Sequence, residues 1–176
     1  RVSARDLKWC ELQAKAVESI LLEKGDVLFI RTNAVRERVG KTAVYQGDPA
    51  YALFASYLIR ARLKKDQLEP DFLQYLTMAA TGASQLSGRA SPAADGKFNI
   101  NMKTIDSVLI PLPSIHEQQE IVTLLKGIDR KIDFHERKRR ALKELFNTLL
   151  NKLMTGAMRV ADLDIAHHRT GKDTRA

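Results

Sequence analysis

The sequence predicts an α+β protein: a strand-rich domain over residues 1–113, a long coiled-coil-forming helix over residues 114–156, and a polar tail over residues 157–176. Two observations predict this class. Short β-branched runs bounded by glycine, proline and aspartate fill the first part, which is typical of strands joined by turns. Apolar residues that alternate at spacings of four and three fill the second part, which is typical of a helix that pairs with another helix.

Three runs in the first part predict β-strands. They are residues 27–32 (VLFIRT), 42–45 (TAVY) and 56–63 (SYLIRARL). In the last run Arg60 and Arg62 are two residues apart and therefore share one face of the strand, for which an ordinary solvated face is one interpretation. Residues 70–76 open with proline and carry apolar residues at helical spacing, which predicts a helix.

Two polar segments are predicted to be exposed loops. Residues 33–41 connect the first two strands, and residues 81–101 form a longer stretch rich in Gly, Ser, Ala and Pro. Loops of this length and polarity are usually functional or disordered. We therefore look for binding residues in these two segments.

The predicted helix has recognisable ends and a continuous apolar seam. Ser114 and Glu117 form a capping box, and Gly156 suits the position just after a helix. At about 1.5 Å per residue the helix is roughly 60 Å long, too long for a small domain to cover. His135 and Arg139 interrupt the seam near its middle, as a device that fixes register or orientation would. The alternative is an ordinary amphipathic helix that packs on its own domain. The seam residues are Ile121, Leu125, Ile128, Ile132, His135, Arg139, Leu142, Phe146, Leu149 and Leu153.

Composition narrows the setting and the partners. The net charge of +8 and the pI near 9.7 favour a polyanionic partner, although many basic proteins bind no nucleic acid. The single Cys10 excludes an internal disulfide framework, and no apolar run is long enough to span a membrane. We therefore expect a cytoplasmic protein with no membrane partner. Because the chain begins with Arg1 rather than Met, we also expect that it was cut from something longer.

The sequence predicts no catalytic residues. It contains no glycine-rich phosphate loop, and its four histidines, at positions 116, 135, 167 and 168, lack zinc-ligand spacing. We accordingly expect no enzyme activity, no cofactor and no metal in this chain.

Five short motifs resemble those of a known family. In order they are Gly-Asp-Val-Leu-Phe at 25–29, Val-Gly-Lys at 39–41, Asn-Ile-Asn at 99–101, Ile-Pro-Leu-Pro at 110–113 followed by Glu117 and Gln118, and Leu-Met-Thr-Gly at 153–156. Over roughly residues 21–163 the chain resembles the specificity subunit of type I restriction–modification systems. The resemblance implies that residues 1–113 are one target-recognition domain without its opening strands, and that residues 114–156 are its spacer and dimerisation helix.

The same resemblance implies a function and partners. A full subunit carries two recognition domains, each of which reads one half of a split target in double-stranded DNA, and its two long helices pair antiparallel. Methyltransferase and restriction/translocase subunits do the chemistry on that scaffold. The helix here would pair with its own copy or with the second helix of the intact subunit, and the chain itself would be non-catalytic.

Residues of the two loops have the chemistry that DNA recognition needs. Arginine can fork onto guanine, asparagine and glutamine can bind adenine, and cations hold phosphates. The alternative for each is an ordinary role in a turn, as for Asn99 and Asn101. The candidate DNA-binding residues are Arg31, Asn33, Arg36, Arg38, Lys41, Gln85, Arg89, Lys97, Asn99 and Asn101.

Three functions follow from these observations. The main interpretation is a DNA-specificity module that also scaffolds the catalytic subunits. The alternatives are a coiled-coil assembly or structural protein whose basic surface is incidental, and a fragment of a fused restriction–methylation enzyme. The sequence does not reveal which bases are read.

Overall fold

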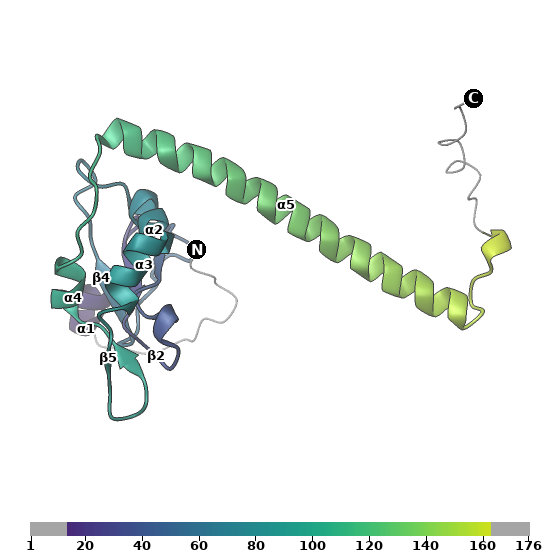
Figure 1. Cartoon of the computed structure of the whole chain (residues 1–176), viewed down its shortest axis with the longest axis horizontal. Coiled ribbons are helices and arrows are strands. Elements are labelled where there is room, and N and C mark those ends of the chain that lie inside the picture. The colour runs from purple at the N-terminus through teal and green to yellow at the C-terminus, as the bar shows by residue number, and fades with distance from the viewer. Residues whose placement is uncertain (1–13, 163–176) are drawn as a thin grey trace. The chain divides into compact units, whose positions relative to one another are not determined.

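The computed structural model describes residues 14–162, which form two compact units divided between Leu125 and Lys126 (Figure 1). The first unit contains every strand found in the described residues and also the first eleven residues of the long helix. The expected α+β class is confirmed, because small antiparallel sheets precede one long helix.

A three-stranded antiparallel sheet forms the centre of the first unit. Its strand order is β3 (Thr42–Val44), β1 (Val27–Ile30) and β4 (Leu58–Ala61). Phe29 lies opposite both Thr42 and Ile59 in this register. The three strands lie within the predicted runs, although each is shorter than its run.

Both faces of the sheet are covered, because successive residues of β1 point to opposite sides. Val27 and Phe29 belong to the main core, which includes Leu73 of α2 (Pro70–Met78) and Leu86 of α3 (Ala80–Ser87). Leu28 points to the other side and packs with Leu22 and Tyr45. The short α1 (Ala14–Ile20) precedes this second cluster.

The expected exposed loop over residues 81–101 is wrong. The segment forms most of α3, followed by a hairpin of β5 (Ser91–Pro92) and β6 (Phe98–Asn99). Its glycine and serine residues have low helix propensity, but tertiary packing overrides it. Gly82 is buried against the backbone of Leu76, where a side chain would collide with the carbonyl oxygen.

The hairpin belongs to a second sheet of order β2-β6-β5, where β2 (Thr32–Asn33) joins the end of the predicted strand 27–32 to the start of the predicted loop 33–41. Between β2 and β3 lies a short 3₁₀ helix, η1 (Arg36–Arg38). After the hairpin, α4 (Met102–Asp106) leads to the proline-rich segment that precedes the long helix.

The long helix α5 (Ile115–Met154) is unbroken over 40 residues. The predicted ends are confirmed: the Ser114 hydroxyl accepts the amide of Glu117 at 3.3 Å, and Gly156 has a left-handed φ of 71°. Residues 160–162 of the predicted tail form the 3₁₀ helix η2 (Val160–Asp162), and the rest of that tail lies outside the described residues.

The first turns of α5 are fixed within the first unit by one buried side chain. Gln118 is fully buried, and its Oε1 accepts the backbone amide of Glu69 at 2.9 Å. Its Nε2 donates to the carbonyl oxygens of Gln67 at 3.0 Å and Pro113 at 2.9 Å. All three partners are backbone groups, and the side-chain amide is fully satisfied.

Candidate nucleic-acid interface

The two predicted binding loops, about sixty residues apart in sequence, meet in the small second sheet. Thr32 pairs with Asn99, and Asn33 pairs with Phe98. Just before β2 and just after β6, the carbonyl oxygen of Arg31 accepts a hydrogen bond from the amide of Ile100 at 2.9 Å. The candidate residues of the two loops therefore lie on one continuous part of the first unit.

Buried glycine packing also holds the first loop against α3. Gly40 has a left-handed φ of 81°, and a Cβ atom built on it would lie 2.5 Å from the Cβ of Leu86. Val39 and Leu86 are each at most 2% exposed. The loop therefore has a packed inner side and an exposed outer side.

Four exposed cations give the outer side of this region positive charge. They are Arg31, Arg38, Lys41 and Lys97. Arg38 and Lys41 make no side-chain hydrogen bond or ion pair with any residue between 14 and 162. Lys97 pairs with Asp95 at 2.7 Å at the hairpin tip, and this hydrogen bond lowers the pKa of the Asp95 carboxyl. Arg38 and Lys41, exposed and unpaired among residues 14–162, are therefore suited to phosphate contacts, whereas Arg31 donates from Nη1 to the carbonyl oxygen of Ser56 at 3.4 Å.

Other predicted residues bind the protein itself. Arg36 uses Nε and Nη2 on backbone carbonyl oxygens at the end of α3, and Arg89 donates to the carbonyl oxygen of Ser107 at 2.9 Å. Gln85 bonds both backbone groups of Leu109, at 2.9 and 3.0 Å. These contacts give the three side chains structural roles.

The three asparagines also differ in their surroundings. Asn33 Oδ1 accepts the amide of Val35 at 2.9 Å, which closes a local turn. Asn101 caps α4 by accepting the amide of Thr104 at 2.9 Å, as the alternative interpretation of this residue expected. Asn99 is half-buried in β6 beside the exposed hairpin.

Two contributors to this region lack a periodic signal in the sequence. Phe98 lies beneath the Arg36 guanidinium, whose Cζ is 5.6 Å from the ring centroid. Tyr57 is 57% exposed, and its carbonyl oxygen accepts the amide of Arg31. The only sequence signal for Phe98 is that an aromatic residue interrupts a stretch of small and polar ones.

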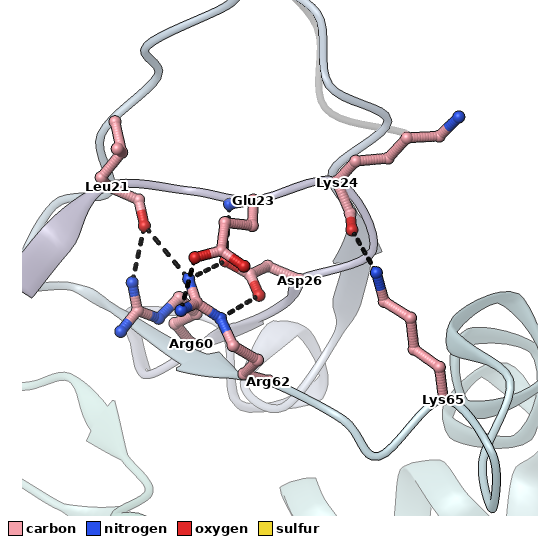
Figure 2. Close-up of polar contacts among 7 residues, drawn as sticks. All are labelled: Leu21, Glu23, Lys24, Asp26, Arg60, Arg62 and Lys65. Carbon is pink, nitrogen blue, oxygen red and sulfur yellow. Dashed lines mark hydrogen bonds and ion pairs between the residues drawn. The ribbon is translucent and has the colours of Figure 1, made fainter.

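Arg60 and Arg62 share one face, as predicted, but that face is not simply solvated (Figure 2). Arg60 donates to the carbonyl oxygen of Leu21 at 2.7 Å, and Arg62 pairs with Asp26 at 3.0 Å and with Glu23 at 2.7 Å. Burial opposes ionisation of Asp26, but the bonds from Arg62 and from the Glu23 amide outweigh it and hold the pKa of this carboxyl below its ordinary value. These arginines fasten β4 to the preceding turn.

The candidate pairing seam lies on α5. Ile121 and Leu125 are half-buried in the first unit, whereas Ile128 and Ile132 are more than half exposed. Within the second unit, His135 and Arg139 line a shallow hollow together with these two isoleucines. Exposed apolar residues also lie outside the strict seam. They are Leu124, Phe134, Leu145, Leu150 and Met154.

Residues 14–162 contain no group of three potential metal ligands among His, Cys, Asp and Glu. In the same range no helix is long and apolar enough to cross a membrane.

Residues 3–144 match the family described as the type I restriction modification DNA specificity domain. The chain belongs to this family. This chain is 30% identical over 131 residues to a protein of Methanocaldococcus jannaschii that is named as the putative type I restriction enzyme MjaX specificity subunit. The matched segment covers 74% of this chain and 30% of that relative.

Two bacterial relatives give similar matches to this DNA specificity domain. The StySPI specificity subunit of Salmonella potsdam is 27% identical over 149 residues, covering 85% of this chain and 32% of the relative. The EcoKI specificity subunit of Escherichia coli is 27% identical over 159 residues, covering 90% and 34%. The chain spans about a third of the length of these curated relatives.

Proposed function

We propose that this chain is a DNA-recognition module that reads one half of a split duplex target in a type I restriction–modification system. The observation that carries the proposal is the meeting of residues 31–41 with the β5–β6 hairpin at one sheet, in a chain of a DNA specificity family. Segments that were distant in sequence thus offer a single basic surface to one ligand.

The contacts of each side chain suggest a division of roles on that surface. Arg38 and Lys41 are exposed and have no partner in the described residues, so we assign them to phosphates. Arg31, Lys97 and Asn99 lie near the sheet and the hairpin and are the candidates for base edges. The other five candidates bond to backbone groups and support the local structure. They are Asn33, Arg36, Gln85, Arg89 and Asn101.

The partners follow from the same proposal. We infer that methyltransferase and restriction/translocase subunits supply the chemistry, and that α5 pairs antiparallel with a second long helix. The exposed apolar stripe of α5 supports this pairing, because soluble monomers rarely leave such a stripe uncovered. The module would act in the cytoplasm, and by itself it would neither methylate nor cleave DNA nor bind S-adenosylmethionine.

Salt-dependent binding of the full chain to a duplex library of randomised sequence tests the function. We expect enrichment of a short motif and an affinity that falls steeply with salt, because each neutralised phosphate releases counterion. Arg38→Ala and Lys41→Ala should each reduce the salt slope by about one and weaken binding to all sequences alike. Lys64→Ala removes the same charge from an exposed site outside the surface and should change neither quantity. Binding without an enriched motif would contradict the proposed function.

A further inference from the structure

The side chain of Arg36 connects three parts of the candidate interface. Its Nε donates to the carbonyl oxygen of Ser87 at 3.0 Å, and its Nη2 donates to those of Gly88 at 2.8 Å and Ala90 at 3.4 Å. Ser87 ends α3, and Ala90 directly precedes β5. One guanidinium therefore bonds both the end of a helix and the start of the hairpin.

The chemistry of these partners suits arginine. The last carbonyl groups of a helix lack partners within it and carry partial negative charge, so a cation there is favourable. The planar guanidinium can donate to several acceptors at fixed angles, which a lysine ammonium cannot reproduce. The Arg36 guanidinium also lies over the ring of Phe98 in the second strand of the hairpin. The contact adds a cation–π attraction.

The backbone before and after Arg36 contacts the same two elements. Asn33, three residues earlier, pairs with Phe98, and Gly40, four residues later, packs on Leu86. The loop of Arg36, the end of α3 and the hairpin thus form one connected cluster. A change in the Arg36 contacts would move the hairpin relative to the loop that carries Arg38 and Lys41.

We propose that Arg36 is a positioning residue for DNA reading: it holds the β5–β6 hairpin at a fixed place beside the loop of residues 33–41 and acts through their side chains. The proposal rests on the proposed function. It replaces the sequence-based expectation that Arg36 itself contacts the duplex. Its Nη1 atom is not used in the three bonds, so a phosphate contact through Nη1 is the competing role that an experiment must separate.

The first experiment needs no DNA. Amide hydrogen exchange of the full chain is compared between the native protein, R36K and R62K. R62K is the matched control, because Arg62 is also an arginine that ties two segments together, but at β4. We expect R36K to raise exchange of the hairpin amides of Gly96 and Lys97 several-fold, relative to the amides of β1. Unchanged exchange of these hairpin amides in R36K would overturn the proposal that Arg36 holds the hairpin in place.

The second experiment measures selectivity with the randomised duplex library. R36K keeps the positive charge. If Arg36 contacts a phosphate, R36K should enrich the same motif as the native protein. If Arg36 positions the hairpin, R36K should enrich that motif less strongly. We expect the ratio of motif binding to non-specific binding to fall about tenfold, the value of one good base contact, with the salt slope unchanged. R62K should keep the native motif at a temperature where both variants are folded. Phe98→Leu, which removes only the ring, should weaken the motif less than R36K.

The outcomes separate the two proposals. A native protein that enriches a motif, together with an R36K variant that enriches it equally well, overturns the role of Arg36 and leaves the proposed function intact. An Arg36→Ala variant that enriches the native motif but has a salt slope lower by about one also overturns the positioning role, in favour of a phosphate contact. A native protein without any motif overturns the proposed function and the positioning role with it.

Discussion

Asp26, with only 2% of its side chain exposed, accepts hydrogen bonds from two nitrogens of Arg62, Nε at 3.0 Å and Nη2 at 3.1 Å. A forked pair of this kind is stronger and more directional than a single contact. It joins the turn before β1 to the residue that follows β4, and thereby ties these two paired strands together at one end.

The pair predicts a pH dependence of stability. Because the folded-state pKa of Asp26 is lowered, its contribution is present above its ordinary pKa of about 3.9 and is lost as pH falls through the folded-state value. Asp26→Asn should lower the free energy of unfolding at pH 7 by about 1–3 kcal/mol and flatten its decline below pH 4. Denaturant unfolding between pH 2 and pH 7 measures both effects. Asp95→Asn is the control, since the solvent screens the exposed pair of Asp95 and Lys97. Parallel stability curves for the native protein and Asp26→Asn would contradict the prediction.

Gly40 should tolerate no side chain. Gly40→Ala forces a Cβ atom into a left-handed backbone position and against Leu86, so we expect a loss of about 2–4 kcal/mol in the free energy of unfolding. Gly96 is the matched control, because its φ is 77° but nothing lies within 4 Å of a Cβ atom there. Gly96→Ala should therefore lose only about 1 kcal/mol. Equal losses in thermal or denaturant unfolding would show that the contact with Leu86 is unimportant.

Gln118 should be far more sensitive than its neighbour. Gln118→Leu keeps the approximate size but removes the partner of one amide and two carbonyl groups in part-buried surroundings, which should cost about 2–4 kcal/mol. Gln119 is exposed, so Gln119→Leu should change stability by less than about 0.5 kcal/mol. Calorimetry of both variants makes the comparison. A Gln118→Leu variant as stable as Gln119→Leu would show that the three bonds contribute little.

The exposed stripe of α5 predicts association through the seam. Leu142→Asp combined with Phe146→Asp should abolish helix pairing, because each large apolar side chain contributes about 1.5–3 kcal/mol when fully buried. Leucine at both His135 and Arg139 should preserve pairing but relax its orientation, since the middle of an antiparallel symmetric seam meets itself near Arg137. Sedimentation over a range of protein concentrations measures the association.

A matched control keeps the charge change the same. Asn147→Asp with Asn151→Asp adds the same two negative charges to exposed positions outside the seam, and should leave pairing intact. A native chain that sediments as a monomer at every concentration, unchanged by Leu142→Asp and Phe146→Asp, would leave only a different chain or the other half of the intact subunit as the partner.

The elements with a clear local pattern were predictable from sequence. The β-branched run around Phe29, the proline start at Pro70 and the capping serine at Ser114 each have a physical signal that the structure confirms. The helix α3 had none, because it consists mainly of small residues and is stabilised by the burial of Gly82 and Leu86.

The candidate site was predictable only as a set of residue types. Strands of two residues, such as β2 and β6, are too short to show periodicity, so their pairing could not be foreseen. The side chain of Arg36 has the same composition signal whether it binds DNA or backbone carbonyl groups. Only the three-dimensional contacts distinguish it from Arg38, which has no partner in the described residues.

The attachment of α5 through Gln118 has a consequence for how such modules can diversify. Its three partners are backbone groups at positions 67, 69 and 113, and almost any residue supplies the same groups. Only proline at position 69 is excluded, because it would remove the amide hydrogen that Oε1 accepts. Mutations can therefore change the proposed DNA-binding surface while the attachment of α5 stays the same. One helix design can in this way serve a whole repertoire of recognition domains, each with its own target.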